Sequence, residues 1–246
     1  MTGFTVAGFD VVELLGYGAT GEVWLAREQA TGEPVALKRL RAHRDLASRD
    51  RMRREAAVLA GVAHPHVVRL RTVLSAGDDL VLVLDHAPGG SLAGLLATRA
   101  RLGPGEVVTL AAPLAQALAA VHAQGVVHGD VTPANVLFAA DGRPLLSDLG
   151  VARLAGEPAG EPEMTSGYAD PSVLGGATPS PSSDVYGLAA VCYVALTGQP
   201  PTTDRSRPPG PVPEAPRALV AAVEAGLDPD PGRRPSAAGF AGAVFD

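Results

Sequence analysis

The amino-acid sequence predicts an α+β fold of two lobes, a small β-rich lobe with one helix and a larger lobe that is mainly helical. Short or alternating apolar runs fill residues 9–84, a pattern typical of strands. The breaker cluster Ala87-Pro88-Gly89-Gly90 follows, and it marks a hinge between the lobes. Beyond it the chain is dominated by long apolar segments, which favour buried helices.

The strands of the small lobe are predicted from five apolar runs, at residues 11–12, 23–25, 35–37, 67–70 and 80–84. One amphipathic helix is predicted between the third and fourth runs, over residues 48–60. Its apolar residues Met52, Ala56 and Leu59 recur at spacings of four and three, so they share one helix face. The sequence therefore predicts a sheet interrupted by a single helix.

The helices of the large lobe are predicted at residues 104–124, 182–196 and 236–244. The uncharged stretch 107–127 approaches the length of a membrane span. It carries polar residues and proline, however, so we interpret it as a buried core helix and expect no membrane insertion. Cys192 falls in the second of these helices, where an apolar core position is expected.

Charge and composition exclude several classes of protein. The 246 residues carry a formal net charge of −6, which argues against a general binder of nucleic acids or membrane surfaces. A single cysteine allows no internal disulfide, and the first ten residues lack the pattern of a secretory signal. We therefore expect a cytoplasmic protein.

Lys38 is the only lysine among the 20 basic Lys and Arg residues. An ammonium group is a compact point charge, whereas guanidinium is a wide planar fork, so a site that requires one does not accept the other. Lysine commonly binds phosphate as such a point charge. We therefore expect Lys38 to contact a phosphate group.

A glycine motif, Gly16-Tyr17-Gly18-Ala19-Thr20-Gly21, precedes Lys38. This pattern alone is weak evidence, because Rossmann folds and plain hairpins also contain it. In a Rossmann unit a helix would follow, but residues 22–26 read as a second strand. The motif is therefore expected to form a hairpin whose glycine amides can approach phosphates.

Further motifs follow in a fixed order. They are Val35-Ala36-Leu37-Lys38, Arg54-Glu55-Ala56, His64-Pro65, His128-Gly129-Asp130-Val131-Thr132-Pro133-Ala134-Asn135, Ser147-Asp148-Leu149-Gly150, Ser183-Asp184-Val185-Tyr186-Gly187, Leu196-Thr197-Gly198-Gln199-Pro200-Pro201 and Asp230-Pro231-Gly232-Arg233-Arg234-Pro235. In this order they resemble the catalytic domain of bacterial eukaryotic-like (Hanks-type) serine/threonine protein kinases. The resemblance implies one bilobal kinase domain over residues 1–246, with an antiparallel sheet in the N-lobe (1–84), a hinge (85–91) and a C-lobe (92–246).

The resemblance also implies ATP as the phosphoryl donor and assigns catalytic roles. Asp130 would accept or orient the proton of the substrate hydroxyl. Asn135 and Asp148 would be the metal ligands for Mg²⁺, with Mn²⁺ as an alternative, because hard oxygen ligands suit such cations. Lys38 would contact the phosphates and pair with Glu55.

The other implied nucleotide contacts surround the base and the phosphates. Val23, Ala36 and Leu137 would enclose the adenine, the backbone of the hinge would meet its edge, and Leu84 would lie behind it. Asp184 would support the catalytic loop, and an apolar stack of Leu59, Leu70, His128 and Leu149 would couple the lobes. The nucleotide set is Gly16, Gly18, Gly21, Val23, Ala36, Lys38, Glu55, Leu84, Asp85, Ala87 and Leu137.

Two departures from the family lie in the catalytic loop. The family usually has Arg where this chain has Gly129, and Lys where it has Thr132, and Ala134 supplies no charge either. Loss of a transition-state charge lowers rates strongly, so slow transfer is expected. The missing Arg normally grips a phosphate on the activation segment, and residues 149–164 contain no Ser, Thr or Tyr. We expect activity that is independent of phosphorylation there, with Thr165 at the substrate site.

Two further departures concern the substrate platform. Asp170-Pro171-Ser172 stands where the family has Ala-Pro-Glu, so the glutamate that pairs with an arginine of the 233–234 region is absent, and a weakened brace is expected. Prolines between residues 200 and 216 forbid a docking helix of useful length.

Three functional classes follow from these observations. The first is an ATP-dependent serine/threonine protein kinase, the second is a nucleotide-binding pseudokinase that acts as a scaffold or allosteric partner, and the third is a small-molecule phosphotransferase. The expected partner is a protein substrate or a signalling protein, and not a nucleic acid. The sequence leaves the oligomeric state open.

Overall fold

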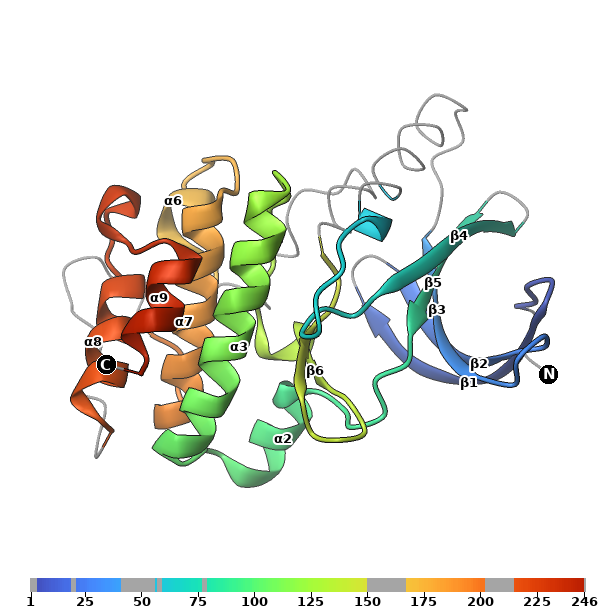
Figure 1. The fold of residues 1–246 in the computed structure, drawn as a ribbon, viewed down its shortest axis with the longest axis horizontal. Helices are drawn as coiled ribbons and strands as arrows, with labels where there is room; N and C mark the ends of the chain where they lie inside the picture. The colour runs from blue at the N-terminus through green and yellow to red at the C-terminus, as the bar shows by residue number, and fades with distance from the viewer. Residues whose placement is uncertain are drawn as a thin grey trace.

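The computed structural model has the predicted two-lobe α+β architecture, with a sheet at one end and a helical bundle at the other (Figure 1). It describes residues 4–18, 21–40, 56, 59–76, 79–149, 167–201 and 215–245. The predictions for Glu55, for Thr165, for residues 150–166 and for the prolines at 208–213 lie outside these residues.

The small lobe contains a five-stranded sheet in the order β1-β2-β3-β5-β4, in which neighbouring strands are antiparallel. The apolar faces of these strands are covered on one side by Phe4 and Val6, which join a buried cluster with Trp24. The strands are β1 (Phe9–Gly18), β2 (Gly21–Glu28), β3 (Pro34–Leu40), β4 (Leu70–Ala76) and β5 (Asp79–Asp85).

The fourth strand begins later than predicted, at Leu70, and the expected strand over residues 67–70 is wrong in its bounds. Val67 forms a parallel bridge with Leu146 in the large lobe instead. The Val68 amide donates to the Leu146 carbonyl at 2.8 Å, and the Leu146 amide donates to the His66 carbonyl at 2.9 Å. This apolar run therefore joins the two lobes before it enters the sheet.

The predicted helix over residues 48–60 is described only at Ala56, Leu59 and Ala60, and all three are helical. Ala56 is buried in a cluster under the sheet, and Leu59 packs against both that cluster and the core of the large lobe. These residues lie at the contact between the lobes.

The large lobe is built around α3 (Pro104–Ala123) and α7 (Pro181–Thr197), which pack against each other. The predicted helices 104–124, 182–196 and 236–244 are confirmed to within one residue at each end. The remaining elements are α2 (Leu92–Arg99), α6 (Pro171–Leu174), α8 (Arg217–Gly226), α9 (Ala237–Ala243), the 3-10 turns η1 (Pro133–Asn135) and η2 (Pro231–Arg233), and the hairpin β6 (Val136–Phe138) and β7 (Pro144–Leu146).

Helix α3 is long and apolar enough to cross a membrane by length and composition. In the fold it packs against α7 and α9, and it contributes nine buried residues to the core (Figure 1). The prediction of a core helix is thus confirmed. Cys192 of α7 is completely buried, and burial raises the pKa of its thiol to about 12, so it is a core residue as expected.

The hinge follows directly on β5 and ends at Ser91, whose hydroxyl caps α2 by accepting from the Gly94 amide at 3.1 Å. Gly89 and Gly90 pair with Phe138 of β6 through two backbone hydrogen bonds of 2.9 Å. A Cβ atom on Gly89 would lie 2.7 Å from the Phe138 Cβ, so only glycine permits this approach. The hinge is therefore anchored to the large lobe.

Candidate nucleotide and phosphoryl-transfer site

The glycine motif forms a hairpin between β1 and β2, in which Gly18 pairs with Gly21, and the Rossmann alternative is excluded. Gly21 has a φ of +136°, and a Cβ there would lie 2.0 Å from the Arg39 carbonyl oxygen. No other residue fits so close to β3. Gly16 has open space around its Cα, which leaves room for a ligand over the sheet.

Lys38 lies on β3 opposite Val23 of β2 and Leu82 of β5, and only 2% of its surface is exposed. Its Nζ lies 2.8 Å from Oδ2 of Asp148, which follows the hairpin of the large lobe. Asp148 has a φ of +61°, an uncommon conformation for a residue other than glycine. The ion pair thus joins the expected phosphate anchor of one lobe to the expected metal ligand of the other.

The residues expected around adenine lie on the strands next to the hinge. Ala36 on β3 pairs with Leu84 on β5, and Leu137 on β6 bridges to Ser91 at the end of the hinge. The Asp85 carboxylate accepts from Arg71 Nε at 2.5 Å. Within the described part of the chain the Ala87 N–H donates no hydrogen bond, so this donor is left for a ligand.

The catalytic loop is closed by Asn135, whose Nδ2 donates at 2.8 Å both to the Asp130 carbonyl oxygen and to its Oδ2. The amide oxygen of Asn135 is then directed elsewhere, which suits a metal ligand. Burial raises the pKa of Asp130, and neighbouring positive charge together with the hydrogen bond from Asn135 only partly opposes this shift. A carboxylate with a raised pKa in this position can accept a proton.

His128 acts as a packed anchor of the loop, as its neighbours indicate. Its ring is buried, Nε2 donates to the Ser147 carbonyl oxygen at 2.9 Å, and Nδ1 accepts from the Asp130 amide at 3.3 Å. One nitrogen donates and the other accepts, which is the pattern of a neutral imidazole. The ring thereby ties Asp130 to the residue that precedes Asp148.

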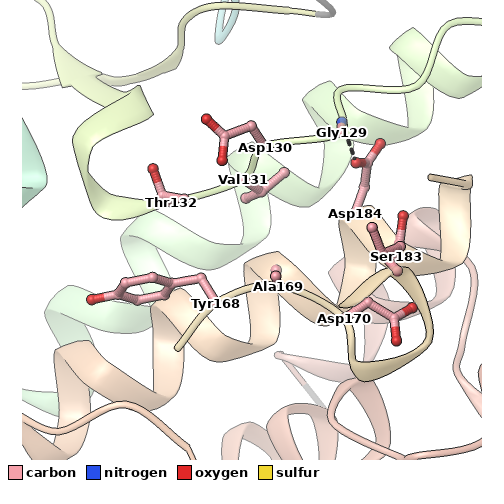
Figure 2. Close-up of a pocket in the computed structure, with 11 residues that line it drawn as sticks. Gly129, Asp130, Val131, Thr132, Tyr168, Ala169, Asp170, Ser183 and Asp184 are labelled. Carbon is pink, nitrogen blue, oxygen red and sulfur yellow. Dashed lines mark hydrogen bonds between the residues drawn. The ribbon is translucent and has the colours of Figure 1, made fainter. Parts of the chain in front are cut away.

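Asp184 on α7 supports the loop from below (Figure 2). Its oxygens accept from the amides of His128 and Gly129 at 2.8 Å each, and Oδ2 also lies 2.8 Å from His122 Nε2. Gly187, one turn along the helix, is needed because a Cβ there would lie 2.9 Å from the Val131 Cβ. The sequence motifs predict the role of Asp184 but not that of His122, since nothing in the local sequence signals that contact.

Gly129 and Thr132, the two departures in the loop, border a small pocket between the loop, the segment 168–170 and the start of α7 (Figure 2). Gly129 has a φ of +80°, in the left-handed region that favours glycine. Thr132 is buried, with 7% of its surface exposed. Tyr168 forms the opposite wall of the pocket.

The prediction of a weakened substrate platform is wrong, because Asp170 replaces the absent glutamate. Arg234 Nη1 and Nη2 donate to Asp170 Oδ2 and Oδ1 at 2.5 and 3.0 Å, and both side chains are buried. The guanidinium also lies 4.9 Å from the centre of the Tyr186 ring. Ser172, at the usual position of the glutamate, donates its amide to Asp170. The ion pair that braces the substrate platform is therefore present, and its carboxylate lies two residues before the usual position of the glutamate.

The predicted apolar stack is placed at the junction of the lobes. Leu70 belongs to the cluster under the sheet, Leu149 belongs to the core of the large lobe, and Leu59 packs against both. His128 lies in the loop between them, and its role in coupling the lobes stays a prediction.

Known proteins with similar sequences bear on this site. The protein kinase domain family matches residues 9–209. The serine/threonine-protein kinase PkaA of Streptomyces coelicolor is 37% identical over 93% of the chain, and PkaB of the same organism is 40% identical over 77%. PknK of Mycobacterium tuberculosis is 37% identical over 78%. The chain spans 48% of the length of PkaA and PkaB and 18% of that of PknK.

Proposed function

The chain belongs to the protein kinase family, and on this premise we propose that it is an ATP-dependent serine/threonine protein kinase. It would transfer the γ-phosphoryl group of ATP to a hydroxyl group of a protein substrate. A location in the cytoplasm is part of the same proposal.

The observation that carries the proposal is the 2.8 Å ion pair between Lys38 and Asp148. It brings the only lysine of the chain, on the small lobe, to the carboxylate that follows the catalytic loop. A triphosphate needs positive charge and a metal ion at one place; Lys38 would supply the charge, and the Asp148 carboxylate would hold the ion at the junction of the lobes. The glycine hairpin lies on the strand beside Lys38.

The donor set beside this pair fits Mg²⁺, with Mn²⁺ as an alternative. The side-chain nitrogen of Asn135 makes two hydrogen bonds, and its amide oxygen takes part in neither. Asp148 contacts Lys38 through Oδ2, and Oδ1 is its second carboxylate oxygen. Both are hard oxygen ligands, which these cations prefer. When bound, the ion would neutralise charge on the phosphates.

Asp130 would receive the proton of the substrate hydroxyl. Its Oδ2 is fixed by Asn135, and its backbone amide is fixed by His128, which together hold the carboxylate at the edge of the loop. Its raised pKa makes it a better proton acceptor than an ordinary aspartate.

The loop also favours activity without phosphorylation of the activation segment. Gly129 has no side chain to grip a phosphate, and residues 149–164 offer no hydroxyl to modify. A phosphate in this segment that raises activity, found by mass spectrometry, would contradict this part of the proposal.

A second function, that of a nucleotide-binding scaffold, is favoured by one observation. Residues 129–135 contain neither lysine nor arginine, so the loop itself offers the transferring phosphoryl group no cation. Such a protein would bind ATP and Mg²⁺ at the same site without transfer.

One experiment separates the two functions. The purified protein is incubated with γ-labelled ATP and Mg²⁺, alone and with a generic basic protein, beside the Asp130→Asn variant. Label on serine or threonine that the substitution abolishes supports the kinase. Nucleotide binding without any transfer supports the scaffold, and transfer to a small molecule alone would indicate the third class.

A further inference from the structure

Among the described residues, the positive charges nearest the catalytic loop are held in ion pairs. Lys38 is held by Asp148 at 2.8 Å, and Arg234 is held by Asp170 in the buried ion pair. His128 uses both ring nitrogens and is neutral in this arrangement. Since residues 129–135 include no lysine or arginine, no cation of the loop is left to face Asp130.

Two oxygen groups of the loop are left without such a partner. Within the described ranges, the Asp130 carboxylate accepts a hydrogen bond from Asn135 at Oδ2, and its Oδ1 accepts none. The Thr132 hydroxyl has no partner there either, although the residue is more than nine-tenths buried. A buried hydroxyl without a partner is costly, so a ligand that donates a hydrogen bond to it would remove that cost.

The geometry of the loop places these groups together. Figure 2 shows the Asp130 carboxylate and the Thr132 hydroxyl on the same side of the loop. The pocket that both residues line is also bordered by Gly129 and Tyr168. A Cβ on Gly129 would meet only the Pro179 Cβ, at 3.8 Å.

We propose that Asp130 and Thr132 form a binding site for a guanidinium or ammonium group of the protein substrate, which supplies the positive charge that the catalytic loop lacks. Thr132 Oγ1 and Asp130 Oδ1 would accept hydrogen bonds from this group. The substrate would therefore need a basic residue close to its acceptor serine or threonine. This inference rests on the proposed kinase function.

The reaction itself balances without consuming the cation. The acceptor oxygen forms a bond to the γ-phosphorus, the bond from that phosphorus to the ADP oxygen breaks, and the hydroxyl proton passes to Asp130. The basic group of the substrate only stabilises the negative charge on the transferring phosphoryl group.

The test measures peptide binding to the protein loaded with Mg²⁺ and a non-hydrolysable ATP analogue. A serine peptide carries one arginine, moved through the positions on either side of the serine, and each peptide has a twin with neutral citrulline. We expect at least one arginine peptide to bind about tenfold more tightly than its twin, as a charge-assisted hydrogen bond would give. Transfer rates with ATP should follow the same preference.

Variants at Thr132 decide the role of this residue. Thr132→Lys should reduce the preference for arginine to less than about twofold, because its ammonium group fills the site, and should speed transfer to the citrulline peptides. Thr132→Val keeps the shape and should lose most of the preference. The control Thr109→Val, at an exposed position of α3, should leave the preference unchanged.

The proposal is overturned if arginine and citrulline peptides bind the wild-type protein alike at every position. It is also overturned if the Thr132→Lys variant has the wild-type melting temperature and still shows the full preference for arginine. Because binding is measured without transfer, the two proposals can fail separately. A protein that shows the preference but transfers no phosphate would retain the cation site and lose the kinase function.

Discussion

Arg234 donates two hydrogen bonds to Asp170 in an ion pair from which solvent is excluded, and the partners are 64 positions apart in the chain. The pair connects the segment before α6 to the turn before α9, and the guanidinium also faces the Tyr186 ring. The segment 168–170, which lines the pocket beside the catalytic loop, is therefore held in place by the Asp170 carboxylate.

Removal of this carboxylate should destabilise the fold. Asp170→Ala leaves the Arg234 charge buried and unpaired, and breaking such a pair costs about 3–5 kcal/mol of unfolding free energy. Urea unfolding would measure the loss. In the double variant with Arg234→Met the loss should be smaller than the sum of the single losses.

Ser172→Glu is the matched control for this pair. It restores the glutamate of the family at its usual position, but Arg234 is already paired, so its effect on unfolding free energy should be small. A large gain in stability from Ser172→Glu would contradict the view that Asp170 has replaced that glutamate.

Acid should weaken the same pair. Burial alone would raise the pKa of Asp170, but the hydrogen bonds from Arg234 and from the Ser172 amide outweigh it and leave the pKa below the ordinary value. The stabilisation is therefore complete above the unfolded pKa of about 3.9 and is lost as the pH falls through the folded value. The stability difference between wild type and Asp170→Asn should shrink below about pH 4.

Asp130 should show the opposite behaviour. Its folded pKa is raised, so its ionised form costs stability above that pKa, and Asp130→Asn should not lower the unfolding free energy at neutral pH. Transfer should be lost in this variant. In the wild type the acid limb of kcat/KM should lie above the ordinary aspartate pKa of about 3.9, and a limb at or below that value would refute the assignment.

Gly187 should be intolerant of a side chain. A methyl group there would lie 2.9 Å from the Val131 Cβ and 3.0 Å from its carbonyl oxygen, so Gly187→Ala must displace the catalytic loop. We expect a loss of about 1–3 kcal/mol in unfolding free energy, together with slower transfer.

Gly105→Ala supplies the control, because a Cβ at this position of α3 meets nothing within 4 Å. Alanine is the better helix former by up to about 1 kcal/mol, so this variant should be as stable as wild type or more stable. Equal losses in the two variants would show that the contact of Gly187 with the loop is unimportant.

The sequence predicted the elements with a strong period and missed relationships between distant residues. Helices α3 and α7 were expected because their apolar runs are long, whereas the run 67–70 was misplaced because it pairs with Leu146 before it joins the sheet. The site motifs identified Lys38, Asp130 and Asp148, but not the bond between Lys38 and Asp148. The contact of His122 with Asp184 spans 62 positions, and no local pattern reveals such a pair.

The central claim is that Lys38 and Asp148 form one site for ATP and its metal ion. It is tested most directly by the dissociation constant of ATP, measured with and without Mg²⁺, for wild type, Lys38→Met and Asp148→Asn. We predict that Lys38→Met weakens binding about 10- to 100-fold under both conditions, as expected for the loss of a charge-assisted contact. Asp148→Asn should remove only the gain in affinity that Mg²⁺ provides. Wild-type affinity in Lys38→Met, or an undiminished Mg²⁺ effect in Asp148→Asn, would contradict the claim.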